Sequence, residues 1–212
     1  ATPTSASPAA SPVVNALDKA AEAAASKPSV YENGTLTFGA DKKVNVSAAP
    51  GVNFKGFGGN GTKIRFGDAD TLEISGSGGE KVKLRSFNID GVESDQKLGK
   101  EAKQLVEGLI SNAANVQVVI SDSKKEKNGR QLGDIFVDGQ SLNKLMISAG
   151  YAQVLPGKIS GMSPAEEREM LALQQEAQLA KRGQWRLKPW ESISPALHRA
   201  WGDTLTPPEL RK

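Results

Sequence analysis

Apolar and polar residues alternate along several short stretches in the first half of the chain. The clearest are TKIRF, DTLEI and EKVKLRS, in which every second side chain is apolar. A period of two is typical of a β-strand with one buried face. The run SGSGG separates the last two stretches and has the composition of a hairpin turn, so we expect the strands on either side of it to pair.

The period of the apolar positions then lengthens to three and four in QKLGKEAKQLVEGLI, which predicts an amphipathic helix. The stretches NVQVVI and QLGDIFV indicate two further strands around the charged loop SDSKKEKNGR. A short second helix is expected on SLNKLMISAGY, with Gly150 as its stop. The side chains that these two helices should bury are Leu98, Ala102, Leu105, Val106, Leu109, Ile110, Leu142, Leu145 and Met146.

A third helix has the clearest start signal in the chain. Ser163 is its expected N-cap, Pro164 lies in the first turn, and Glu166 follows three residues after the cap, which makes a capping box. We expect this helix to run to about Arg182 and to end at Gly183. The order of the expected elements is strands, a helix, two strands, a helix and a final helix. This order predicts an α+β domain, a five-stranded OB-fold β-barrel with about three packed helices.

The segments that flank this domain differ from it in composition. Residues 1–29 are rich in Ala, Ser and Pro and predict a tail or linker that is dispensable for the fold, although it could contact a protein partner. Residues 30–61 form a strand-rich N-terminal extension with the stretches TLTF, KVNVS and VNFKGF. Residues 62–185 are the predicted barrel, and residues 186–212 form a C-terminal extension. The run GFGGNG lacks the ending of a phosphate-binding loop and favours a turn.

Composition excludes several kinds of site. The chain has no cysteine and a single histidine, His198, so thiolate metal sites, cysteine nucleophiles and histidine metal clusters are excluded. A net charge of +3 and a pI near 9.0 permit a polyanionic partner. No apolar run is long enough for a membrane span, so we expect a soluble protein. The start at Ala1 suggests a removed leader, natural or engineered, and weakly favours an exported or otherwise processed protein.

Four short blocks resemble, in order and spacing, the staphylococcal thermonuclease family: GDADT, RSFNIDGVE, LGKEA and NGRQLGDIFVDG. Each block alone is weak evidence, and an aspartate at a strand end is most often a turn residue. The resemblance covers about 120 residues and implies a barrel that cleaves nucleic acid with calcium, leaving 3′-phosphates. The positions that match the family's motifs are Asp68, Asp70, Thr71, Arg85, Asp90, Glu93, Gly99, Glu101, Ala102, Gly129 and Arg130.

The residue types also suit this chemistry without the family. Phosphodiester hydrolysis requires a base that deprotonates water and positive charge at the reacting phosphate. Asp70 and Asp90 offer the hard oxygen ligands that calcium prefers. Arg85 and Arg130 can each donate forked hydrogen bonds to phosphate. The spacing of Glu93 from Asp90 suits a water-activating carboxylate.

The resemblance adds two assignments and carries three departures. It implies that the Gly91 carbonyl is a third calcium ligand and that Glu93 is the general base. The family commonly has proline where Val92 stands, so the turn that aims the base is expected to be looser. Tyrosines that contact phosphate in well-known members are replaced by Asn128 and Pro156.

Two other classes of function stay open beside the nuclease hypothesis. The same barrel could hold nucleic acid or a protein without turnover, or it could be a structural component of a larger assembly. DNA or RNA preference and oligomeric state are not predicted by the sequence.

Overall fold

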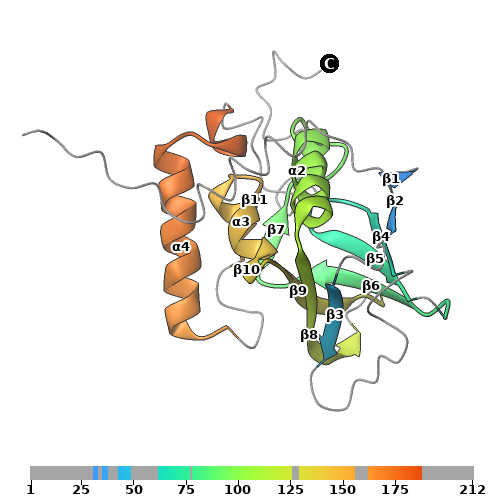
Figure 1. Cartoon of the computed structure of the whole chain (residues 1–212). Helices are drawn as coiled ribbons and strands as arrows, with labels where there is room; N and C mark the ends of the chain where they lie inside the picture. Colours follow the sequence, from blue (N-terminus) through green and yellow to red (C-terminus); the bar gives the residue numbers. More distant parts are fainter. Residues whose placement is uncertain are drawn as a thin grey trace, which may run out of the picture.

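The computed structural model describes residues 31–32, 35–37, 43–48, 62–76, 78–125, 129–155 and 162–187 (Figure 1). The four ranges after residue 61 contain most of a curled sheet and the helices packed against it. The strands are β1 (Tyr31–Glu32), β2 (Thr35–Thr37), β3 (Lys43–Ala48), β4 (Lys63–Phe66), β5 (Thr71–Ser75), β6 (Lys81–Ser86), β7 (Ile89–Gly91), β8 (Asn115–Lys125), β9 (Gln131–Val137), β10 (Gln140–Ser141) and β11 (Ala152–Val154).

The main sheet is mixed and curls into a half-barrel. Its order is β1-β2-β4-β5-β6-β9-β8-β3, with β10 on β9. The pairs β6–β9 and β3–β8 are parallel, and the other pairs are antiparallel. A separate two-stranded sheet joins β7 to β11. The half-barrel with its helices confirms the predicted α+β, OB-type fold, and the hairpin of β5 and β6 was correctly expected from SGSGG.

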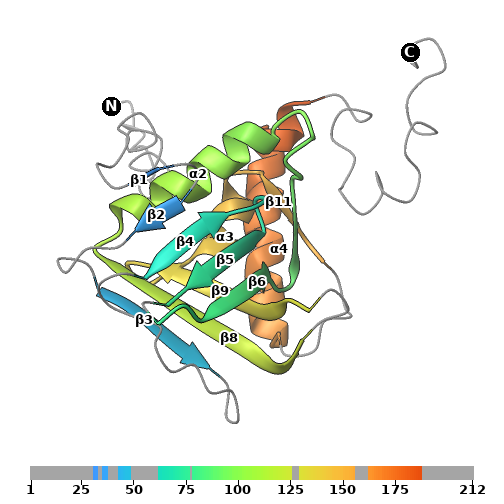
Figure 2. The ribbon, with the colours of Figure 1, turned by 90° about the vertical axis from the view of Figure 1, so that its right-hand side faces the viewer.

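Strands β4, β5 and β6 bury one face, as their alternating sequences require. Their inward side chains belong to one continuous hydrophobic core, whereas the positions between them are exposed or half-buried. The inward side chains of these three strands are Ile64, Phe66, Leu72, Ile74, Val82 and Leu84. This arrangement leaves a polar outer face, which looks toward the viewer in Figure 2.

Three α-helices and a short 3₁₀ helix complete the described fold. Helix α2 (Gly99–Asn112) and helix α3 (Leu142–Ser148) bury the predicted side chains, except that Leu105 is only partly buried. In Figure 1, α3 lies between the sheet and α4 (Pro164–Leu179), and η1 (Gly183–Arg186) follows α4. Among the described residues, no helix is both long and apolar enough to span a membrane.

Helix α4 begins where the sequence predicts and ends earlier. The hydroxyl of Ser163 accepts a hydrogen bond from the Glu166 amide at 3.2 Å, so the cap is confirmed. The expected end near Arg182 is wrong, because Lys181 adopts φ 51° and turns the chain out of the helix. The amides of Lys181 and Arg182 donate to the carbonyls of Gln178 and Ala177, which is the Schellman pattern, with lysine in the position that glycine usually takes.

The segment before residue 62 contributes strands to both edges of the half-barrel. Strand β2 pairs with β4 at one edge, and β3 pairs in parallel with β8 at the other. Strand β8 also runs to Lys125, so the first part of the predicted loop SDSKKEKNGR belongs to a strand. The predicted stretch VNFKGF, the tail of residues 1–29 and the segment 188–212 lie outside the described residues.

Candidate functional site

A tight turn between β4 and β5 positions Asp70. The amide of Gly67 donates to the Thr71 carbonyl at 3.0 Å, and a Cβ on Gly67 would lie 2.9 Å from that same oxygen. The Asp70 carbonyl accepts from the amide of Ser86, at the end of β6, at 2.8 Å. The turn is therefore fixed to the neighbouring strand, and the side chain of Asp70 is almost fully buried.

Three donors contact the Asp70 carboxylate. The Thr71 hydroxyl donates to Oδ1 at 3.0 Å, and Arg85 Nη1 lies 2.5 Å from the same oxygen. The amide of Gly91 donates to Oδ2 at 3.0 Å. A Cβ on Gly91 would lie 3.1 Å from the Asp70 Cβ and 3.3 Å from the Ala69 Cβ. Glycine therefore allows the close approach that places its amide on the carboxylate.

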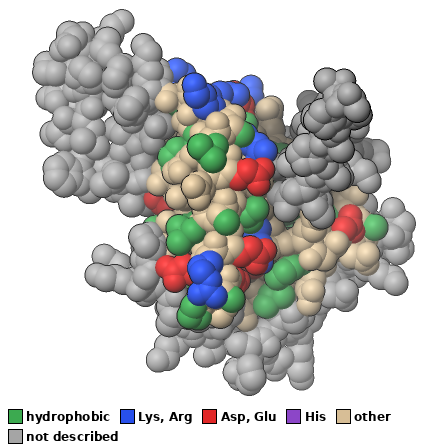
Figure 3. All heavy atoms as spheres, turned by 90° about the vertical axis from the view of Figure 1, so that its left-hand side faces the viewer, with side chains coloured by type: hydrophobic (Ala, Val, Ile, Leu, Met, Phe, Trp, Pro, Cys, Tyr) green, Lys and Arg blue, Asp and Glu red, His purple; other side chains and the backbone are tan. Residues whose placement is uncertain are grey.

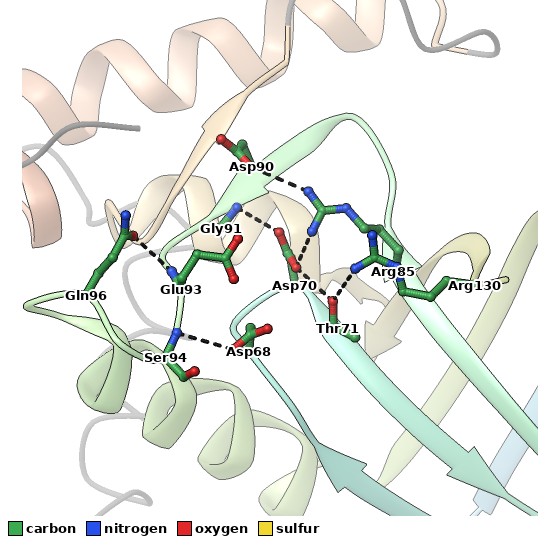
Figure 4. Close-up of polar contacts among 10 residues, drawn as sticks. All are labelled: Asp68, Asp70, Thr71, Arg85, Asp90, Gly91, Glu93, Ser94, Gln96 and Arg130. Carbon is green, nitrogen blue, oxygen red and sulfur yellow. Dashed lines mark hydrogen bonds and ion pairs between the residues drawn. The ribbon is translucent and has the colours of Figure 1, made fainter. Parts of the chain in front are cut away.

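Asp90 reaches the same site from β7. Asn88 has φ 62°, which ends the run of β6 and lets the chain start the short strand that pairs with β11. Asp90 is 2% exposed, and its Oδ1 lies 3.5 Å from Arg85 Nη2. One guanidinium thus faces two buried carboxylates, as Figure 4 shows. The two carboxylates carry one more negative charge than Arg85 balances.

This donor set fits a hard divalent cation. Asp70 and Asp90 bring carboxylate oxygens to one place; Gly91 follows Asp90 in the chain, and its amide donates to Asp70. Across the described residues, no group of three or more His, Cys, Asp or Glu side chains is arranged to hold a metal. A cation here would need backbone or water oxygens beside the two carboxylates, which is common for calcium. The structure brings the predicted ligands together, and their role stays a prediction.

The backbone of Glu93 is held from three directions. Its amide donates to Gln96 Oε1 at 3.0 Å, and the next amide, of Ser94, donates to Asp68 Oδ1 at 3.2 Å. Gly99 packs so closely that a Cβ there would lie 2.1 Å from the Glu93 carbonyl oxygen. In Figure 4 the Glu93 side chain extends from this loop toward Asp70. The half-buried carboxylate is therefore aimed into the site by a fixed backbone.

Val92 holds this loop in a way that proline could not. Its side chain is buried, and its amide donates to the Tyr151 carbonyl at 2.9 Å. Proline has no amide hydrogen, so this bond depends on the departure from the family's pattern. The hydrogen bond to the residue before β11 holds the loop at this point, and the expected loosening of the turn stays a prediction.

Arg130 approaches from the other side of the turn. It precedes β9, and its Nη1 donates to the Thr71 hydroxyl at 3.1 Å, so Thr71 links Arg130 to Asp70. Arg85, Glu93 and Arg130 are thus all brought to the turn that carries Asp70, as Figure 4 shows. The positions of Asn128 and Pro156 lie outside the described residues.

The sequence did not indicate how Ser94 and Gln96 support the site. Gln96 follows Glu93 by three residues, and the Gln96 amide in turn donates to the Glu93 carbonyl at 3.1 Å. A Glu-x-x-Gln spacing just before a helix is the available signal, because residues three apart meet in a turn. Asp68 matched the family's motif but had no expected function, and here its carboxylate anchors the loop of Glu93.

Comparison with known proteins agrees with this arrangement. A family model described as staphylococcal nuclease homologue matches residues 63–187. The chain is also similar to an uncharacterized protein of Bacillus anthracis, with 32% identity over 93 residues. That similarity covers 44% of this chain and 42% of the other protein.

Proposed function

We propose, given that the chain belongs to the family of staphylococcal nuclease homologues, that it is a calcium-dependent endonuclease that hydrolyses phosphodiester bonds of DNA or RNA. The observation that supports this most is the cluster around Arg85. Two buried carboxylates, a guanidinium and the aimed carboxylate of Glu93 come from separate strands and loops to one turn. A fold needs no such concentration of charge for its stability, because burying charges is costly.

Asp70, Asp90 and the carbonyl of Gly91 are the proposed calcium ligands. A calcium ion at this place would supply positive charge to the phosphate oxygens and neutralise the excess negative charge of the two aspartates. The hydrogen bonds from Thr71 and Gly91 orient the Asp70 carboxylate before any ligand arrives. Preorganised ligands of this kind lower the cost of ordering the site on binding.

Arg85 and Arg130 are the proposed phosphate clamps. A guanidinium has five N–H donors, and Arg85 uses Nη1 toward Asp70 and Nη2 toward Asp90. Its remaining donors suit the phosphate oxygens, on which negative charge grows during attack. Arg130 stands on the other side of Thr71, so a phosphate at this turn would meet both arginines.

Glu93 is the proposed general base. Its carboxylate extends toward Asp70, and the loop around it is fixed by Asp68, Gln96 and Gly99. A base held within reach of the attacking water accepts its proton as the water attacks phosphorus. Attack opposite the 5′-oxygen would leave a 3′-phosphate on one product and a 5′-hydroxyl on the other.

A binding module without turnover is the second candidate. The departures at Asn128 and Pro156, where well-known family members have tyrosines that contact phosphate, favour weaker or different substrate contacts. In such a module, Arg85 and Arg130 would hold phosphate while Glu93 had no catalytic effect. Incubation with the same substrates distinguishes the two candidates, because only the enzyme cuts their phosphodiester bonds.

The test is digestion of single- and double-stranded DNA and RNA by the purified full chain, with calcium and with EDTA. We expect cleavage with calcium, none with EDTA, and products that a 3′-phosphatase can dephosphorylate. Binding of all four substrates without any calcium-dependent cleavage would support the binding module and refute the enzyme. Arg130→Ala should slow cleavage by about 10²- to 10³-fold, which links the activity to this site.

A further inference from the structure

Two rows of polar side chains cross the outer face of the sheet beside the candidate site. Their members are opposite one another in register on β2, β4, β5 and β6, and the rows are two residues apart, or about 7 Å. Figure 2 shows these strands side by side. The rows consist of Thr35, Arg65, Glu73 and Lys83, and of Thr37, Lys63, Ser75 and Lys81.

These rows carry mostly positive charge. Four of the eight side chains are basic and exposed, and one is acidic. Glu73 lies 3.5 Å from Lys81, whereas no ion pair involves Lys63, Arg65 or Lys83 among the residues that the structure describes. Glu73 also lies opposite Arg65 and Lys83 in register, and with one acidic side chain against four basic ones the two rows keep a net charge of +3. Their charge suits a polyanion.

A hollow connects the rows to the candidate site. It encloses about 420 Å³, and its lining includes Arg65, Glu73 and Lys83 from the first row. Thr71 and Arg130, which belong to the candidate site, line the same hollow. A chain of phosphates bound at the site can therefore continue into the hollow, because Thr71 and Arg130 line both.

We propose that this outer face is a binding site for the phosphate backbone of a single nucleic-acid strand. We call it the basic face and define it by Lys63, Arg65, Lys81 and Lys83. The inference rests on the proposed function, since the scissile phosphate of the strand is placed at Arg85 and Arg130. The two rows are about 7 Å apart, so a single line of phosphates can contact both of them.

The composition of the basic face also determines what it recognises. Lysine, arginine and threonine donate hydrogen bonds to phosphate oxygens, and such contacts carry no sequence information. The two rows contain no aromatic side chain on which a base could stack. The basic face therefore holds the strand by its backbone and contributes affinity without base preference.

The test compares two double variants of the full chain. Arg65→Gln with Lys83→Gln removes two charges from the basic face. Arg168→Gln with Lys181→Gln removes the same two residue types from exposed positions in and just after α4. Figure 3 shows basic and acidic side chains interspersed on that side of the molecule. Binding of a fluorescent dinucleotide and dodecanucleotide is measured by anisotropy at several salt concentrations.

We expect the basic-face variant to bind the dodecanucleotide about tenfold more weakly than wild type at low salt. Its slope of log affinity against log salt should be about 1.4 units shallower, because each lost phosphate contact on a single strand removes about 0.7. The loss should be smaller for the dinucleotide, which spans less of the face. The α4 variant should match wild type. Equal affinity and slope for wild type and the basic-face variant would overturn the proposal, as would an equal loss in the α4 variant.

Cleavage measured beside binding separates this inference from the proposed function. If wild type cleaves and the basic-face variant keeps the KM of wild type for the dodecanucleotide, the basic face is refuted and the enzyme stands. If no protein cleaves but the basic-face variant alone loses affinity and salt dependence, the enzyme is refuted and the basic face stands. A raised KM together with the affinity loss in the basic-face variant supports both the enzyme and the basic face.

Discussion

Two places in this barrel bury aspartate, and they satisfy it in different ways. Asp70 and Asp90 face the guanidinium of Arg85 at the turn between β4 and β5. Asp134, on β9, is 5% exposed and has no cationic partner among the described residues. The proposed metal-binding aspartates and Asp134 are therefore all buried, and they differ in whether a cation contacts the carboxylate.

Neutral donors surround Asp134. The amide of Ile135 donates to its Oδ1 at 2.7 Å, the amide of Asn143 donates to the same oxygen at 3.3 Å, and the Ser141 hydroxyl lies 2.5 Å from Oδ2. Ser141 is also the N-cap of α3, because its hydroxyl accepts from the Lys144 amide at 3.2 Å. Asp134 thus fastens the start of α3 to β9. Burial raises its pKa to about 6, although these hydrogen bonds oppose the rise.

The largest difference between the two places should appear in calcium binding. Asp90→Asn removes a charged ligand and should abolish the calcium-dependent rise in Tm, because the remaining carboxylate binds calcium weakly. Asp134→Asn should keep that rise, since Asp134 lies in a separate network. Differential scanning calorimetry with calcium and with EDTA measures both. An unchanged calcium response in Asp90→Asn would remove Asp90 from the proposed ligands.

Removal of Arg85 should destabilise the fold, because burying two carboxylates without a cation is unfavourable. Arg85→Ala leaves Asp70 and Asp90 without their cation and should lower the free energy of unfolding by about 3 to 5 kcal/mol in EDTA. Calcium should restore part of this loss, because it supplies positive charge to the same oxygens. Urea unfolding with and without calcium tests the claim. A destabilisation that calcium does not reduce would argue against a cation at this place.

Asp134 should give the protein a dependence on pH that the Asn variant lacks. A raised pKa in the folded state means that protonation favours folding. The contribution is complete below pH 4 and is lost as pH rises through 6. The stability of wild type relative to Asp134→Asn should therefore fall by about 2 kcal/mol between pH 4 and pH 7. Urea unfolding of both proteins across this range measures it, and a constant difference would contradict the prediction.

The smallest expected effect concerns Ser141. Ser141→Ala removes the N-cap of α3 and should cost about 1 kcal/mol. It also removes a hydrogen bond that lowers the pKa of Asp134, so the pH-dependent fall in stability should move to higher pH. The same unfolding series detects the shift. Loss of stability with no change in its pH profile would mean that Ser141 acts only as a cap.

Much of the fold could be predicted because its signals are local. The period of apolar residues placed α2 and α3, the cap at Ser163 placed the start of α4, and SGSGG placed the hairpin of β5 and β6. The parallel pairing of β3 with β8 and the small sheet of β7 with β11 could not be predicted, since strands distant in the sequence leave no periodic signal of their partners.

The site was predictable to a similar extent. Motif spacing named Asp70, Asp90, Arg85, Glu93 and Arg130, and the structure gathers all five at one turn. The groups that hold these side chains in place could not be predicted from the sequence, because their contacts form only in the fold. The bond from the Val92 amide to the Tyr151 carbonyl joins residues far apart in the chain. The role of Asp134 could not be predicted either. In the sequence it is an ordinary strand residue, and its contacts with Ser141 and Asn143 form only in the fold.

We propose that Glu93 activates water at the turn of Asp70 and Asp90, and a single variant separates this role from substrate binding. Glu93→Gln keeps the size and hydrogen bonding of the side chain but removes the base. Its cleavage rate and its affinity for the same single-stranded oligonucleotide are measured beside wild type in calcium, with Asp134→Asn as the control for a lost buried carboxylate. We expect cleavage at least about 10²-fold slower in Glu93→Gln, with affinity nearly unchanged and the control close to wild type. Cleavage by Glu93→Gln at the rate of wild type would contradict this proposal.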